Sequence, residues 1–305
     1  MSVLDQSYRR WKGKPTPYLE RMLVIPRYDA LEILSHRDWA ACYVAALLPP
    51  VILGAYVYFT ANSDVLARLI PGLSNFRLPL PGSDTWASFT YLQLWFIVVF
   101  ALLVGPPLAT RDFANNALPL YLSKALRRFE YIIGRWAILL VLLSAASWLP
   151  LLVVFGLEVA LAPPAWRSEN AWIGGGILAS TIPCVLLVTA LISAVAAHVH
   201  RANLARGAVL AIIIVTWPLG RMLESRTGAP NAQVVSPMAM AVRINIWAFE
   251  PPEAPPRLGA TSVFPGAREP QTMVSVPLAF AVLLAWFLAC IGVLLWRVRP
   301  VEVVK

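Results

Sequence analysis

Residues 86–109 decide the fold: they read WASFTYLQLWFIVVFALLVGPPLA, 24 residues without an Asp, Glu, Lys or Arg. As a helix this stretch is about 36 Å long, and the hydrocarbon core of a bilayer is about 30 Å thick. Backbone polar groups in lipid must be bonded within the protein, and the run is too long and too uniformly apolar for a barrel strand. The sequence therefore predicts a transmembrane helix here.

Five further stretches share this length and character, at residues 39–60, 132–157, 172–197, 204–223 and 273–296. The composition agrees, because 59% of the 305 residues are hydrophobic and 13% are charged, against about 45–50% and about 25% in a soluble domain. We therefore expect an all-α integral membrane protein with six transmembrane helices. It divides into a cytoplasmic tail (1–38) and a six-helix transmembrane domain (39–305).

The distribution of Lys and Arg predicts the orientation. Seven precede the first span, four lie between the second and third, two between the fourth and fifth, and three follow the sixth. The loops on the other side carry seven in all. Because cytoplasmic loops are enriched in Lys and Arg, both termini are expected in the cytoplasm, and the protein in the inner (plasma) membrane as a multi-pass protein. This bias also explains the net charge of +9, so no nucleic acid partner is expected.

The spans contain few polar groups that suggest chemistry. Their only Asp, Glu, Lys or Arg residues are Arg135, Arg206 and Arg221, all near span ends, where long side chains snorkel to water. The absence of a carboxylate at mid-bilayer weighs against a carrier coupled to protons or sodium. No nucleophile–base pair or paired carboxylates appear in the spans, which disfavours an intramembrane enzyme.

Prolines interrupt most spans. Each one removes a backbone donor and favours a bend, and neighbouring helices can bond the carbonyls that this leaves free. The bends are either ordinary helix irregularities or hinges of an opening pathway. These prolines are Pro49, Pro50, Pro106, Pro107, Pro150, Pro183, Pro218 and Pro277.

No cofactor or metal is expected in this chain. Its three cysteines, Cys42, Cys184 and Cys290, lie inside apolar runs, and no G-x-x-x-x-G-K-[ST] motif is present. The chain is therefore not expected to hydrolyse ATP by itself.

Two segments outside the spans carry information. Residues 26–38, PRYDALEILSHRD, place Tyr28, Leu31, Ile33 and Leu34 among charges. This pattern predicts an amphipathic elbow helix on the cytoplasmic surface, with a solvated basic tail as the alternative. Residues 224–272 are rich in proline, and within them 236–249 could form a short helix at the outer interface, or the whole segment could be a linker.

The loop between the second and third spans contains a motif. Asp112 follows the second span, the Leu/Ser-containing run 118–123 comes next, and Lys124, Arg128, Tyr131, Gly134 and Arg135 lead into the third. This pattern resembles the coupling region of ABC-2-type permeases, the membrane subunits of ATP-binding cassette transporters, where Ser-Arg-Pro-x-x-Arg-x-x-Tyr-x-x-Gly-Lys leads into span three. Ala125 replaces the family's proline and Arg135 its lysine.

The resemblance implies an exporter that works by alternating access. Two copies of a cytoplasmic P-loop subunit would bind ATP and magnesium, and a second permease copy would complete a homodimer or related heterodimer in membrane lipid. It also implies that 224–272 forms an external helical element. The residues expected to contact the ATP-binding subunit through a coupling helix are Asp112, Phe113, Lys124, Arg127, Arg128, Glu130, Tyr131, Gly134 and Arg135. A scaffold or accessory subunit without transport activity remains the alternative function.

Overall fold

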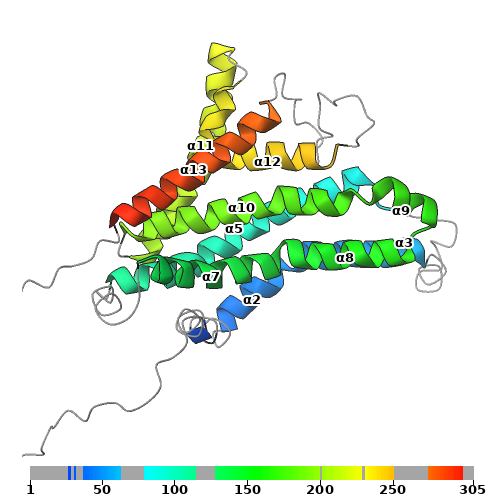
Figure 1. Ribbon diagram of the computed structural model, residues 1–305, viewed down its shortest axis with the longest axis horizontal. Helices are drawn as coiled ribbons and strands as arrows, with labels where there is room; N and C mark the ends of the chain where they lie inside the picture. The colour runs from blue at the N-terminus through cyan, green and yellow to red at the C-terminus, as the bar shows by residue number, and fades with distance from the viewer. Residues whose placement is uncertain are drawn as a thin grey trace, which may run out of the picture.

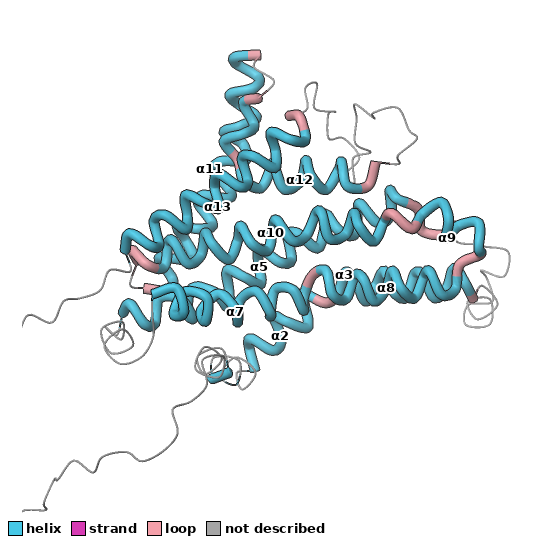
Figure 2. The backbone as a smooth tube through the Cα atoms, in the orientation of Figure 1, coloured by secondary structure: helices cyan, strands magenta, loops and turns pink. Residues whose placement is uncertain are grey.

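The described part of the chain is almost entirely helical. The computed structural model describes residues 27–28, 31, 37–62, 79–114, 128–199, 201–228, 231–250 and 274–297, and it contains no strand within these ranges. Figure 1 and Figure 2 show a bundle in which α5, α10 and the α7–α8 pair run alongside one another, while α11, α12 and α13 cover one side.

The helices match the apolar stretches, with breaks at particular residues. Their bounds are α2 (Arg37–Ala46), α3 (Leu48–Ala61), α5 (Ser83–Ala114), α7 (Arg128–Ala146), α8 (Trp148–Leu161), α9 (Pro164–Asn170), α10 (Ile173–Ala196), α11 (Ala202–Thr227), η2 (Ala232–Val235), α12 (Pro237–Ala248) and α13 (Val276–Arg297).

Among the described residues, five helical stretches are long and apolar enough to cross a membrane: Ser83–Thr110, Ile132–Leu161, Pro164–Ala196, Ala202–Thr227 and Val276–Arg297. The pair α2 and α3, bent by 42°, makes a sixth if it is one span. This confirms the predicted all-α class and fits a multi-pass membrane protein. The side of the membrane on which each terminus lies, and the identity of the membrane, stay predictions.

The third span differs from its predicted bounds. It was expected to end at residue 157, but the helix continues to Leu161 and therefore includes Glu158, which is 1% exposed. The apolar run stops at Glu158, and the sequence signal stops with it. The helix continues because its backbone hydrogen bonding continues past this residue, and the Glu158 side chain is buried against Trp86 of α5. A buried carboxyl thus lies within this span, which the apolar pattern did not indicate.

Two ends of the bundle serve as reference points. The end at which α5 ends and α7 begins is called the α7 end, and it also holds the junction of α10 with α11 and the end of α13 (Figure 1). The opposite end, where α8 ends and α10 begins, is called the α9 end.

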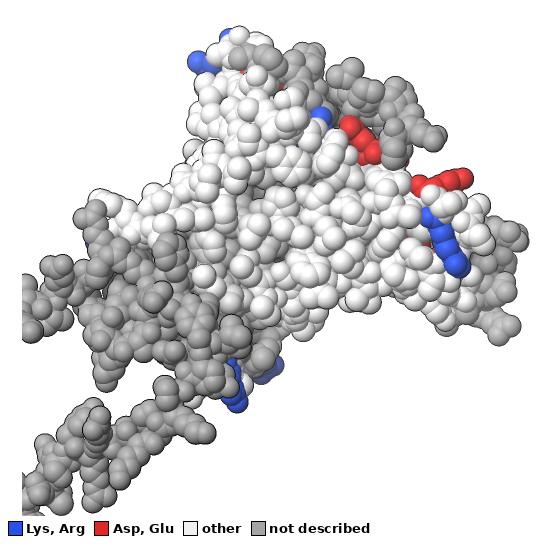
Figure 3. Space-filling view, viewed as in Figure 1, with Lys and Arg blue, Asp and Glu red and all other residues white. Residues whose placement is uncertain are grey.

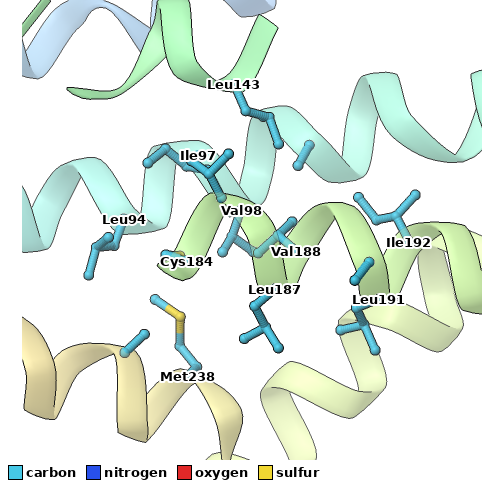
Figure 4. Close-up of a cluster of buried hydrophobic side chains, with 14 of the residues drawn as sticks. Leu94, Ile97, Val98, Leu143, Cys184, Leu187, Val188, Leu191, Ile192 and Met238 are labelled. Atoms are coloured by element: carbon cyan, nitrogen blue, oxygen red, sulfur yellow. The ribbon is translucent and has the colours of Figure 1, made fainter. Parts of the chain in front are cut away.

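The core has two parts. The larger cluster lies between α5 and α10 and includes Leu94, Val98, Val188 and Ile192, as Figure 4 shows. Gly105 of α5 permits this close packing, because a Cβ there would lie 2.9 Å from Ile192. The smaller cluster lies toward the α9 end; its members come from α3, α5, α8, α10 and the end of α12, and its centre includes Leu53, Trp86, Leu151, Ile173 and Phe249.

Apolar side chains cover much of the outside. In the view of Figure 3, the described Lys, Arg, Asp and Glu residues lie toward the ends and upper edge, and the middle of this face is uncharged. On α11 and α13 few side chains of the apolar stretch are buried within the chain. A surface of this kind suits contact with lipid.

Candidate functional site: polar crossings at the proline breaks

The break in the first span leaves a backbone carbonyl without its helical partner. In a continuous helix the carbonyl of Ala46 would accept from the amide of residue 50, but Pro50 has no N–H. Pro49 and Pro50 occupy the first turn of α3, where their missing N–H groups fit a new helix start. The chain therefore ends α2 at Ala46 and restarts at Leu48.

The third span breaks in the same way. Pro150 removes the donor that the carbonyl of Ala146 would use, and Ser147 lies between α7 and α8 with φ −114° and ψ −100°, outside the helical region. Pro50 and Pro150 thus leave two equivalent free carbonyls, on Ala46 and on Ala146, and Pro49 likewise offers no N–H to the carbonyl of Ala45.

A single side chain bonds both carbonyls. The amide nitrogen Nε2 of Gln93, in α5, donates to the Ala46 oxygen at 2.9 Å and to the Ala146 oxygen at 2.5 Å. The amide group carries two N–H donors, so both bonds can exist together. Gln93 is fully buried. The three spans meet at this one polar group, which we call the Gln93 crossing (Gln93, Ala46 and Ala146).

A second bond supports the crossing. The Tyr43 hydroxyl, in α2, donates to the Ala145 carbonyl of α7 at 3.1 Å. The bond thus joins α2 of the first span to α7 of the third beside the breaks.

The proline pair in α5 is bonded by an arginine. Pro106 and Pro107 leave the carbonyls of Leu102 and Leu103 without helical donors. Arg206 of α11 supplies both, because Nε donates to Leu102 at 3.2 Å and Nη2 to Leu103 at 2.9 Å. The sequence suggested that Arg206 snorkels to water. In the structure its guanidinium bonds α5, and α5 continues through the prolines without a break.

Several buried polar atoms near these helices have no hydrogen-bond partner among the described residues. They include Oε1 of Gln93, Oγ of Ser147 and Oγ1 of Thr90. Unpaired buried polar atoms cost about 1–3 kcal/mol each. Gln93 therefore holds the crossing through its NH₂ group alone, and its Oε1 could accept from a new donor if the helices move.

A second polar contact lies toward the α9 end. The Trp86 indole N–H, at the start of α5, donates to Oε2 of Glu158 at 2.7 Å, while Oε1 of Glu158 has no partner in the described structure. Trp86 also meets Phe155 edge to face, with 5.6 Å between ring centroids. This contact holds α8 against the start of α5.

The segment 224–272 contains a helix where one was expected. The Ser236 hydroxyl accepts from the Ala239 amide and caps α12. Nε of Arg243 donates to the Val274 carbonyl at 2.9 Å, which ties α12 to the residues before α13. Burial lowers the pKa of Arg243, and the charge of Glu250 opposes that shift. Residues 251–273 lie outside the described part, and the external position of the segment stays a prediction.

The predicted coupling residues are only partly described. Asp112 and Phe113 lie on the last turn of α5, and Arg128, Glu130 and Tyr131 on the first turn of α7. Gly134 is buried and Arg135 half-buried in α7. Lys124 and Arg127 lie outside the described residues, as does most of the predicted elbow 26–38. The two helices that carry this motif, α5 and α7, pack against each other.

Metal ligands do not gather in the described ranges, where no group of three or more His, Cys, Asp or Glu is placed to hold an ion. Comparison with protein-family models and with curated proteins finds no match for the chain. The resemblance of residues 112–135 to a coupling region therefore stands on the sequence motif alone.

Proposed function

We propose that this protein is the membrane-spanning permease subunit of an ATP-binding cassette exporter of the ABC-2 type. The observation that carries the proposal is the motif from Asp112 to Arg135 between the second and third spans. The partners in this proposal are two cytoplasmic P-loop subunits, which bind ATP and magnesium, and a second permease copy.

The arrangement of the helices supports the proposal. α5 extends to Ala114, beyond its spanning stretch, which ends at Thr110, and α7 begins at Arg128. The described part of the motif is therefore carried by two helix ends that project past the apolar region at the α7 end. A partner that binds there could push on two spans at once, because α5 and α7 pack against each other.

The proposed mechanism uses these two helix ends to transmit movement from the ATP-binding subunits. Closure of the ATP-binding subunits displaces the loop between α5 and α7, and rigid helices transmit the displacement into the bundle. The first, second and fifth spans then rotate against the second permease copy and change which side of the membrane can reach the pathway. In this chain the second and fifth spans are α5 and α11, and Arg206 bonds one to the other.

Charge reversal in the loop tests the proposal. The double variant Asp112→Arg with Arg128→Glu is expected to insert into the membrane normally, yet to lose coupling between ATP hydrolysis and transport, because it inverts the charges that face the partner. Glu169→Lys is the matched control, since Glu169 is exposed in α9, at the end of the bundle opposite the end of α5 and the start of α7. Coupled transport that is unchanged in the double variant would contradict the assigned loop.

A further inference from the structure

We propose that Gln93 joins the breaks of the first and third spans into one hinge, so that α3 and α8 move as a single body. This inference concerns motion within the chain and does not depend on the nature of the partner.

The first support is the geometry of the Gln93 crossing. One NH₂ group reaches the carbonyls of Ala46 and Ala146, so the two breaks lie side by side at the same level of the bundle. Each broken point lacks the backbone bond that would resist bending. A bend at one break moves a carbonyl that the other break shares through Gln93, and the two bends are therefore linked.

The second support is the division of the core at the breaks. Ala46 and Ala146 belong to the larger cluster, together with Leu143 of α7, whereas Leu53 of α3 and Leu151 of α8 belong to the smaller one. Each broken span thus has one half in each cluster. Bending at the breaks moves α3 and α8 with little disturbance of the packing between α5 and α10.

The third support is the contact between the two moving halves. α3 and α8 pack directly against each other. A Cβ on Gly54 of α3 would lie 3.4 Å from the Val154 side chain of α8, so the helices are close at this point. The Trp86–Glu158 bond joins α8 to the start of α5, so this polar contact has to give way when the α3–α8 body moves.

The prolines provide a sharp genetic test. Alanine at positions 50 and 150 returns an N–H to each helix, and the carbonyls of Ala46 and Ala146 then find partners in their own helices. These two carbonyls need the N–H donors of Gln93 only while the prolines are present. Replacing Gln93 should therefore loosen the hinge in the natural chain and have no such effect in the P50A/P150A chain.

Distances between spin labels measure the hinge. The full-length chain, with its three cysteines replaced by alanine, is labelled at Ile52 of α3 or Val153 of α8, each paired with Val99 of α5, and studied in lipid nanodiscs. All three labelled positions are exposed. We expect Q93L to broaden both distance distributions and to leave the distance between Ile52 and Val153 unchanged, because those two belong to one body.

The control is T90V, which removes another buried polar atom of α5, one turn from Gln93, without removing a bond to either break. It should leave both distributions as they are.

In the P50A/P150A chain, Q93L should broaden neither distance distribution. If that chain cannot be purified, the single variants apply: with P50A or P150A alone, Q93L should broaden both distributions by less than in the natural chain, because one of the two breaks keeps its own backbone bond. Unchanged distributions in Q93L, a change in the Ile52–Val153 distance, or equal broadening with and without the prolines would overturn the proposal.

Discussion

The replacement of Gln93 by leucine should have an effect on stability whose sign depends on two distant prolines. In the natural chain, Q93L leaves the carbonyls of Ala46 and Ala146 buried and without a donor. At about 1–3 kcal/mol per buried unpaired group, the loss is about 2–6 kcal/mol. The same change removes Oε1 of Gln93, an acceptor without a partner, which returns about 1–3 kcal/mol. At the same value per group, two losses and one return leave a net destabilisation of about 1–3 kcal/mol.

In the P50A/P150A chain the first effect disappears, because both carbonyls are bonded within their own helices. Only the removal of buried amide atoms remains, so Q93L is expected to be neutral or to stabilise the protein by about 1 kcal/mol. The assay is unfolding by SDS titration in mixed micelles for the four chains of the cycle. Destabilisation by Q93L of the same size in both backgrounds would refute the assignment of Gln93 to the proline breaks.

Three other predictions concern single contacts and use the same unfolding assay. R206L should destabilise the protein by about 1–2 kcal/mol, in the lower part of the range for unpaired buried polar groups, because Arg206 is only half-buried. R206K, which lacks the forked guanidinium, should restore part of this stability. Equal stability of R206L and the natural chain would exclude the bonds to α5. E158L should lower the free energy of unfolding by about 1–3 kcal/mol, because it leaves the Trp86 indole N–H buried without an acceptor. E158Q keeps an acceptor oxygen and should lower it by less. A larger loss of stability in E158Q than in E158L would count against this contact. G176A should destabilise by about 1–3 kcal/mol, because a Cβ there meets the backbone oxygen at the end of α12, whereas its neighbour variant G175A has open space and should stabilise by about 0.5–1 kcal/mol; identical effects of the two would contradict the helix contact.

The spans could be predicted from the sequence because length and apolar character are local properties. The second span is an example, since residues 86–109 are all helical and all lie inside α5. The ends were less predictable. α5 continues to Ala114 and α8 to Leu161, because a helix ends where its backbone bonding ends and not where its side chains stop being apolar.

The prolines predicted free carbonyls, and the structure confirms that neighbouring helices bond them at Pro50, Pro106, Pro107 and Pro150. Which side chains do so was not predictable, because the partners come from segments distant in the sequence. Arg206 and Leu102, for example, are 104 residues apart. Gln93 did leave a signal, as a lone amide in a run of apolar residues.

Glu158 shows the opposite case. It stands at the edge of an apolar run, where a carboxylate is ordinarily a surface residue, and only the tertiary contact with Trp86 explains its burial. The coupling motif depends on sequence pattern, and among its members the structure describes the burial of Gly134 and Arg135 alone.

The central claim is that a separate ATPase works this chain through the loop between α5 and α7, and purification from native membranes tests it most directly. The full-length chain, extracted in mild detergent, should bring down a P-loop ATPase in a one-to-one ratio, and the Asp112→Arg with Arg128→Glu variant should lose it or its coupling. A pure, stable complex that retains its native partners and contains no ATP-hydrolysing subunit would contradict the claim and favour a scaffold.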